Sequence, residues 1–405
     1  MVILNTIVCD AEKEYEADIR IENGVISEIA KDLKDTQSID AKGAYFMPLM
    51  IDTNVRLLDS TLNSKNLKNL SDEALKGGVG HLVLNADSEP VIDNEVVLEF
   101  AQNGLRDLDG SKIDLMLNSL KEDSTLSNIA ILLKSGAKVP FMSTIAKNDV
   151  AIKIAEYALM YDVTIFCKAE DNSLIKSGVM LEARVNSKLG LAGIPDLSEV
   201  LHVSRMIEIA RHFKIKILFK SVASPRSIYL INQAKKDGVE VSCEVSIHHL
   251  MFCDEACEDF NTTAKLDPPL ASKSDMKLLQ DALKNKQIDI LTTLHQPNSP
   301  LNKEVAFFNA AYGCEAISDA MPLYYTKLVK SKMISMSELV KLTTKNSANS
   351  IKEKYVNIEV GQKVNAMLFD KNVKNVVNNE QSLYNGQTLN GKVIMTFMNE
   401  NVTRF

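Results

Sequence analysis

Several apolar segments of the sequence, each a candidate strand, end in polar or charged residues. At the end of a strand these side chains could lie close together. Asn54 and Arg56 are two residues apart, so on a strand both project to the same side. Lys168 directly follows the apolar residues 163–167. Arginine is always protonated and its planar fork matches a carboxylate at two points, whereas lysine is a compact point charge. These residue types predict either an internal ion pair or a site for a small anion.

The histidines and cysteines give weaker signals. His248 and His249 are adjacent, and adjacent residues on a strand point to opposite faces, so structural packing is the favoured interpretation. Cys253 and Cys257 could be half of a zinc site, but no second ligand pair has matching spacing. Cys243 and the other cysteines indicate buried free thiols in a reducing compartment.

The composition excludes some classes of function. The 405 residues include 46 Lys and Arg against 53 Asp and Glu, a formal net charge of −7, so no domain-wide basic field exists to hold nucleic acid. No apolar run reaches the roughly 18 residues that a membrane-spanning helix needs, and no secretory signal opens the chain. We therefore expect a cytoplasmic globular protein that binds neither nucleic acid nor membrane.

The elements that must position these side chains alternate between helix and strand through the middle of the chain. Helical patterns, such as those at residues 151–161 and 197–213, are each followed by a strand-like apolar segment. Such units imply parallel strands with right-handed crossovers. Their number predicts a (β/α)8 barrel over residues 47–351, with its chemistry at the carboxyl ends of the strands.

Both ends of the chain instead have the texture of short strands. The predicted strands cover residues 1–9, 16–22, 25–30, 366–370 and 392–398. Asn23 and Gly24 form a hairpin turn between two of them. Because chain ends commonly lie close together, residues 1–46 and 352–405 are predicted to form one composite β-sandwich domain.

A series of short motifs also runs in order along the chain. The motifs occupy residues 46–57, 77–79, 89–93, 168–175, 190–195, 234–239, 244–250, 268–270, 288–290, 361–366 and 391–393. Together, at family-like spacing, they resemble the dihydroorotases of the amidohydrolase superfamily, of the multifunctional-complex type. The resemblance covers nearly the whole chain and implies an amidohydrolase-type barrel. In the family, the first barrel strand carries a His-x-His pair after an Ile-Asp pair.

The positions at which the family carries its metal ligands hold other residues here. The His-x-His pair falls on Asn54 and Arg56, and the next two ligand histidines fall on Lys168 and Ser221. The family's bridging acid or carboxylated lysine has no counterpart within residues 139–146. Amide and hydroxyl groups are poor ligands, and the two cations would oppose a metal ion. We therefore expect no metal and no cofactor.

The positions that the family uses for catalysis and substrate binding depart as well. The catalytic Asp of the family falls on Leu294, which cannot accept a proton, while the neighbouring His295 is retained. The family's substrate-binding Arg and two Asn fall on Leu58, Asp87 and Asp267. These two acids would repel substrate carboxylates where amides donate hydrogen bonds in the family. The resemblance therefore predicts a degenerate pocket without a catalytic residue.

These departures predict a non-catalytic, dihydroorotase-like protein of pyrimidine biosynthesis. The resemblance implies a structural or regulatory partner of aspartate carbamoyltransferase, within a homo-oligomer or hetero-oligomer. Two alternatives stay open. One is an active dihydroorotase, which interconverts N-carbamoyl-aspartate and dihydroorotate with metal-bound hydroxide, using zinc and unrecognised ligands such as His248, His295 or Cys243. The other is a metal-free module that binds a small anion through Arg56 and Lys168.

Overall fold

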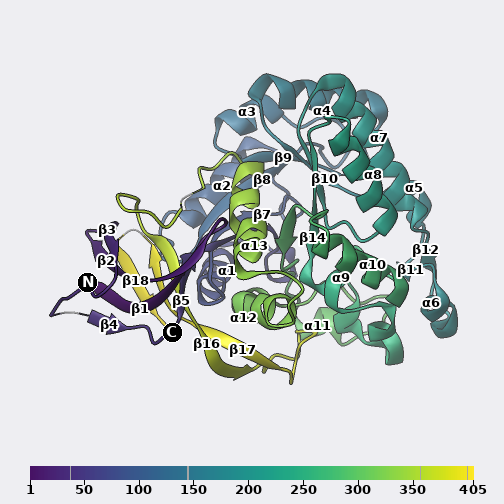
Figure 1. Ribbon diagram of the computed structural model, residues 1–405. Helices are drawn as coiled ribbons and strands as arrows, with labels where there is room; N and C mark the ends of the chain where they lie inside the picture. Colours follow the sequence, from purple (N-terminus) through teal and green to yellow (C-terminus); the bar gives the residue numbers. More distant parts are fainter. Residues whose placement is uncertain (37, 144–145, 356, 399) are drawn as a thin grey trace.

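Eight parallel strands lie side by side at the centre of the computed structural model, which describes residues 1–36, 38–143, 146–355, 357–398 and 400–405 (Figure 1). In chain order they are β6 (Met50–Val55), β7 (Val79–Leu84), β8 (Lys112–Asn118), β9 (Val139–Met142), β10 (Ile165–Lys168), β13 (Ile217–Lys220), β14 (Val241–Ser246) and β15 (Ile290–Thr292). Each strand pairs with the next along the chain. A parallel bridge between Val55 and His295 joins the first strand to the segment after the last, so the sheet curls into a barrel. The predicted (β/α)8 barrel is confirmed.

Helices follow the strands and cover the outside of the barrel (Figure 1). The longer ones are α1 (Ser64–Lys76), α2 (Glu95–Leu105), α3 (Ile129–Lys134), α4 (Asn148–Tyr161), α7 (Leu197–Phe213), α8 (Pro225–Lys236) and α10 (Lys273–Lys284). In α1, the buried residues Leu67, Leu70 and Ala74 recur on one face, which packs inward. The helix begins after Asn63, whose side chain accepts a hydrogen bond from the backbone N–H of Asn66.

Shorter elements fill the connections. They are α5 (Asn172–Ile175), β11 (Met180–Leu181), α6 (Arg184–Leu189), β12 (Gly193–Ile194), α9 (Ile247–Met251), α11 (Pro300–Lys303), α12 (Ala320–Tyr324), α13 (Met336–Val340) and α14 (Asn346–Ser350), with 3-10 turns at Leu58–Ser60, Asp254–Phe260, Thr262–Ala264 and Ile317–Asp319 and π turns at Tyr325–Val329 and Lys341–Lys345. β11 and β12 pair in parallel. His248 and His249 lie in α9, just beyond β14, so the strand geometry used to interpret them does not apply.

A second sheet joins the two ends of the chain. Its strands are β1 (Val2–Cys9), β2 (Glu14–Glu22), β3 (Val25–Ala30), β4 (Ser38–Asp40), β5 (Tyr45–Pro48), β16 (Asn365–Val376), β17 (Thr388–Met398) and β18 (Asn401–Arg404). β5 pairs with β1 on one side and with β16 on the other, with Phe46 opposite Leu368. In Figure 1 the purple and yellow strands accordingly lie side by side. The predicted β-sandwich from both termini is confirmed, while the division of the chain into residues 1–46, 47–351 and 352–405 stays a prediction.

The interior of the barrel is apolar below its carboxyl end. The buried residues that fill it come from successive strands and include Val83, Met116, Phe141, Phe166, Leu218 and Ile290. This packed layer makes the barrel a core and not a channel. Within the described part of the chain, no helix is both long and apolar enough to cross a membrane.

Candidate functional site

The carboxyl ends of the strands bring most of the predicted site residues to one place. A pocket there, called the inner pocket, has a volume of about 20 Å³, room for about one water molecule. Its lining comprises Asn54, Arg56, Phe141, Lys168, Ala169, Glu170, Lys220, Ser221, Asp267 and Pro268. The predicted residues Asn54, Arg56, Lys168, Ser221 and Asp267 therefore share one site, although β6 and β10 lie far apart in the sequence.

Arg56 is a buried cation whose Nη1 has no hydrogen-bond partner among the described residues. Its Nε donates to Asp87 Oδ2 at 2.8 Å, and its side chain is only 9% exposed. Its Nη1 is buried as well. Burial opposes the charged form, but the nearby Asp87 and Asp267 raise the pKa of Arg56. A buried donor without a partner is costly, so Nη1 is a candidate contact for a ligand oxygen.

Lys168 stands between two carboxylates. Its Nζ lies 2.9 Å from Asp267 Oδ2 and 3.1 Å from Glu170 Oε1. Burial opposes the charged form, but Asp267 and Glu170 raise the pKa of Lys168. The expected ion pairs of Arg56 and Lys168 with Asp87 and Asp267 are therefore present, and Glu170 is an additional partner.

Beneath the mouth lies a buried polar cluster that our sequence analysis missed. Glu244 accepts hydrogen bonds from Thr53 Oγ1 at 2.7 Å, from the backbone N–H of Ser221 at 3.2 Å and from Asn54 Nδ2. Lys220 Nζ lies 3.6 Å from Glu244 Oε1 and donates to the backbone carbonyl of Thr53 at 2.6 Å. Asn54 Nδ2 also lies 2.6 Å from Ser221 Oγ. The cluster ties strands β6, β13 and β14 together.

A sequence signal for this cluster existed. Side chains two apart on a strand share a face, and Leu218 of β13 fills the barrel interior. Lys220 therefore had to point inward as well, at the carboxyl end of an otherwise apolar strand. Burial lowers the pKa of Lys220, although Glu244 opposes this shift.

Asp52 fixes the frame of the site. Its carboxylate accepts hydrogen bonds from the backbone N–H of Asn54 at 2.9 Å and from Thr293 through N–H at 2.9 Å and Oγ1 at 2.6 Å. Burial raises the pKa of Asp52 to about 6. The next residues after β13 and after Thr293 are Ser221 and Leu294, whose φ angles are 49° and 50°. L-residues rarely adopt this conformation, and such strain concentrates at functional sites.

The remaining predicted residues do not reach the inner pocket. Leu58 and His295 line a separate pocket of about 150 Å³, the α1 pocket, to which Arg56 also contributes. His295 Nδ1 accepts hydrogen bonds from the backbone N–H groups of Ala316 and Ile317. Burial lowers the pKa of His295 to about 3, so the ring is neutral at pH 7. Leu294 is buried and lines neither pocket.

The alternative ligands are also engaged elsewhere. His248 lies between Tyr384, whose hydroxyl is 3.2 Å from Nδ1, and Cys314, whose Sγ is 3.2 Å from Nε2. Cys243 Sγ donates towards Asp289 Oδ2 at 3.6 Å. Burial lowers the pKa of His248 to about 3. None of these side chains lines the inner pocket.

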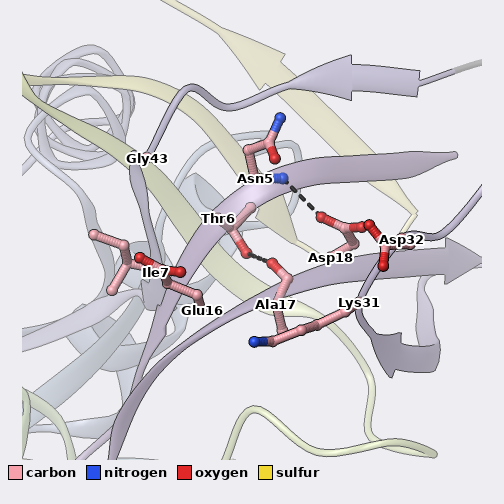
Figure 2. A pocket seen from close by; sticks show the side chains of 9 residues that line it. All are labelled: Asn5, Thr6, Ile7, Glu16, Ala17, Asp18, Lys31, Asp32 and Gly43. Carbon is pink, nitrogen blue, oxygen red and sulfur yellow. Dashed lines mark hydrogen bonds between the residues drawn. The ribbon is translucent and has the colours of Figure 1, made fainter.

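A pocket of about 300 Å³ in the terminal sheet lies in a different part of the molecule (Figure 2). There the carboxylate of Asp18 accepts hydrogen bonds from the backbone N–H groups of Asn5 at 2.7 Å and Leu33 at 3.0 Å. Thr6 Oγ1 donates to the carbonyl of Ala17 at 2.5 Å. The register between β1 and β2 shifts at this point, so these polar groups stabilise a strand irregularity.

The residues at the family's ligand positions do not fit a divalent metal. Asn54 and Ser221 contact each other through neutral groups, while Arg56 and Lys168 are cations and not ligands. Among the described residues, no three or more His, Cys, Asp or Glu side chains gather in a way that could hold a metal ion. Part of the segment predicted to lack a bridging ligand, residues 144–145, lies outside the described residues.

Comparisons with known proteins reveal close relatives along almost the entire chain, although no family model matches it. A dihydroorotase of Acetivibrio thermocellus is 32% identical over 400 residues, 95% of this chain and 94% of that protein. A dihydroorotase of Elusimicrobium minutum is 31% identical over 98% of this chain and 96% of that protein. The L-hydantoinase (dihydropyrimidinase) of Arthrobacter aurescens has a similar fold, with a TM-score of 0.86 and 19% identity over 100% of this chain and 95% of that one.

These relatives overturn two predictions. The prediction of a non-catalytic protein is wrong, because relatives named dihydroorotase match almost the whole chain and favour the alternative of an active enzyme. The prediction of no cofactor is wrong as well, because the dihydroorotase relatives belong to a family whose reaction implies zinc. Asn54, Arg56, Lys168 and Ser221, which stand at the family's ligand positions, do not supply the ligands of that metal. The association with aspartate carbamoyltransferase stays a prediction.

Proposed function

Because the chain belongs to the dihydroorotase family, we propose that it is a cyclic-amide hydrolase that interconverts dihydroorotate and N-carbamoyl-aspartate. The observation that carries this proposal is the 32% identity to a dihydroorotase across 95% of the chain. The confirmed barrel supports it, since chemistry in this fold takes place at the carboxyl ends of the strands. The inner pocket lies at those ends.

Arg56 is our candidate for binding the substrate carboxylate. Both partners in the reaction carry at least one carboxylate, and a guanidinium group recognises carboxylates through two parallel donors. Asp87 holds Nε, while Nη1 is left without a partner among the described residues. The pair with Asp87 fixes the orientation of the planar group, so its free donor is positioned before a ligand arrives.

Lys168 is our candidate for stabilising developing negative charge. Attack on an amide carbonyl places charge on its oxygen, and a fixed cation in a site shielded from water stabilises that charge. The side chain of Lys168 is 29% exposed at the inner pocket, and Asp267 and Glu170 hold its Nζ in place. These two acids also offset the positive charge, so the pocket does not bind every anion tightly.

The first prediction is that the purified protein turns over both substrates and that Arg56→Met raises KM. Loss of a hydrogen bond to a charged group removes about 1.5–3 kcal/mol, which corresponds to roughly a 10- to 100-fold higher KM. Formation and consumption of dihydroorotate are followed by absorbance, with and without added zinc. Arg211→Met is the matched control, because Arg211 pairs with Glu208 and Asp237 at the surface.

Three results bear on this proposal. Turnover by the wild type with a raised KM only in Arg56→Met supports it. Turnover in neither direction, with or without zinc, would overturn it. Equal KM values for the wild type and a folded Arg56→Met variant would remove Arg56 from substrate binding and leave the reaction itself supported.

A further inference from the structure

Glu170 stands between two pockets at the mouth of the barrel. Beside the inner pocket lies a second one of about 110 Å³, the outer pocket. Its lining is mostly apolar, and its charged members are Glu170, Asp196, Glu199, Arg226 and Asp275. Ala169, Glu170 and Pro268 belong to both pockets. The two pockets therefore adjoin at Glu170.

The other acids near the inner pocket are committed to structural contacts. Asp52 and Glu244 each accept three hydrogen bonds from the barrel strands and loops, and neither lines the inner pocket. Asp87 is bonded to Arg56 and does not line it either. Asp267 does line it. Burial would raise the pKa of Asp267, but the cations beside it lower that pKa, which keeps it ionised.

Glu170 differs from these acids in its partners and in the direction of its pKa shift. Its side chain is 13% exposed, and among the described residues its ion-pair partner is Lys168 at 3.1 Å. Burial raises the pKa of Glu170, against the opposing effect of Lys168. A general acid–base group is most effective when its pKa lies near the working pH. Among the described acids that line either pocket, Glu170 alone lines both, and it does so beside the ammonium group of Lys168.

We infer that Glu170 is the proton-transfer residue of this enzyme. The inference rests on the proposed function and deepens it, since Leu294 stands where the family carries its proton-accepting Asp and cannot take a proton. In this arrangement the acid comes from the residues after β10 instead of from those after β15. The substrate class it serves is a cyclic amide bearing a carboxylate, placed with its ring at the outer pocket and its charge towards Arg56.

The step balances without any further reagent. In the hydrolytic direction, the Glu170 carboxylate takes a proton from water as the water oxygen forms a bond to the ring carbonyl carbon. The carbonyl oxygen becomes negative beside Lys168. The carbon–nitrogen bond then breaks as the oxyanion collapses, and Glu170 gives its proton to the leaving nitrogen. The new carboxylic acid releases one proton to solvent, so one water is consumed, and cyclisation is the reverse.

Several charged groups face Glu170 and set its pH response. From the inner pocket they are Lys168, Asp267, Arg56 and Lys220, and from the outer pocket Asp196, Glu199, Arg226 and Asp275. Burial raises the pKa of Glu199 to about 7, against its hydrogen bonds from the N–H groups of Ala223 and Ser224. A Glu199→Gln variant is therefore needed to separate the titration of this second buried acid from that of Glu170.

The test compares Glu170→Gln with the neighbouring Asp171→Asn, a matched loss of one negative charge outside both pockets. Proton transfer contributes about 10²–10⁴-fold to rate, so kcat of Glu170→Gln should fall by that factor while KM changes little. The fall in rate at acidic pH, which reports protonation of the carboxylate that acts as the base, should vanish in Glu170→Gln and remain in Glu199→Gln. Asp171→Asn should keep both kcat and the pH profile.

Chemical rescue separates lost chemistry from lost folding. Formate added to Glu170→Ala can supply a carboxylate in the vacated space, and we expect it to restore part of kcat, which a misfolded protein would not permit. Wild-type turnover with Glu170→Gln at more than a tenth of its kcat would overturn this inference and leave the proposed function intact. Absence of wild-type turnover would overturn both.

Discussion

Lys220 and Glu244 form an ion pair inside the barrel, beneath its mouth. Their side chains are 4% and 0% exposed. Taking charges out of water is costly, and their mutual attraction offsets this cost only when further hydrogen bonds complete both groups. Thr53, Asn54 and Ser221 provide those bonds. At the scale of single residues, the stability of the site therefore depends on the ion pair as a whole and not on either charge alone.

After those for Arg56 and Glu170, the third prediction concerns the ion pair of Lys220 and Glu244. Lys220→Met leaves Glu244 buried without its cation, and removing one partner of a buried pair typically costs about 3–5 kcal/mol. We expect the free energy of unfolding in urea to fall by that amount. The double variant Lys220→Met with Glu244→Gln should recover part of the loss. A loss below about 1 kcal/mol in the single variant would show that the charges are not coupled.

At this same scale the sequence predicted some side chains well and missed others. The ion pairs of Arg56 and Lys168 followed from their residue types at strand ends, and the structure has them. Lys220 was overlooked because a lysine after an apolar run is usually solvated, and its inward direction depends on strand alternation inside a closed barrel. Glu170 was not singled out as a site residue, since pocket walls are formed by segments distant in sequence.

Among the elements, the connection after β15 is held by two lysines instead of by regular structure. Lys265 Nζ donates to the backbone carbonyls of Phe307, Phe308 and Ala310 at 2.7–2.9 Å. Lys303 Nζ donates to the carbonyls of Thr262 and Ala311 at 2.7 and 2.9 Å, and both ammonium groups are buried. These bonds satisfy carbonyl groups that a helix or sheet would otherwise satisfy.

The fourth prediction concerns pH and this connection. Burial lowers the pKa of Lys303 from 10.5 to about 8. Between these two values Lys303 binds more protons in the unfolded chain than in the folded one, so it contributes a rise in stability with pH of up to about 1.4 kcal/mol per pH unit. Buried cysteines such as Cys167 and Cys314, whose pKa values burial raises to about 12, contribute in the opposite direction. Urea unfolding at pH 8 to 10 measures this slope. Lys303→Met should lower the slope by up to that amount relative to the wild type, whereas Lys284→Met on the exposed face of α10 should leave the slope unchanged.

The helices and strands themselves could largely be predicted from the periodicity of apolar residues in the sequence. Residues 151–161 and 197–213 lie within or coincide with α4 and α7, because their apolar spacing matches the face that packs on the barrel. The connections were not readable in the same way. The α5 to β12 insertion and the segment around α11 have little periodicity, and tertiary bonds such as those of Lys265 decide their course.

For the whole molecule, buried histidines dominate the response to acid. Burial lowers the pKa values of His202, His248 and His295 to about 3 and that of His249 to about 4. The unfolded chain therefore binds more protons below pH 6.5, and stability should fall as pH drops from 6.5 towards 4. Asp52 and Glu199, with pKa values raised to about 6 and about 7, act in the opposite direction.

The fifth prediction is the direction in which the free energy of unfolding changes when the pH falls. Among the groups with the largest shifts in this range, four destabilise the fold on acidification and two stabilise it, so we expect a loss of about 1–3 kcal/mol per pH unit between pH 6.5 and 4.5. The raised pKa values of Glu170, Asp254 and Asp319 reduce this loss. Urea unfolding at three pH values measures it. His248→Asn should flatten the dependence, while His212→Gln at the exposed end of α7 should not. A stability that increases on acidification would contradict the prediction.

The pairing of β5 with β16 also affects how this chain folds while the ribosome synthesises it. β5 leaves the tunnel early, yet the strand that pairs with its open edge follows only after the whole barrel has been made. At about 5–20 residues per second, that interval is roughly 15–60 s. An uncovered strand edge is prone to pair with other chains, so the nascent amino-terminal sheet needs protection from a chaperone or from its own barrel during this time.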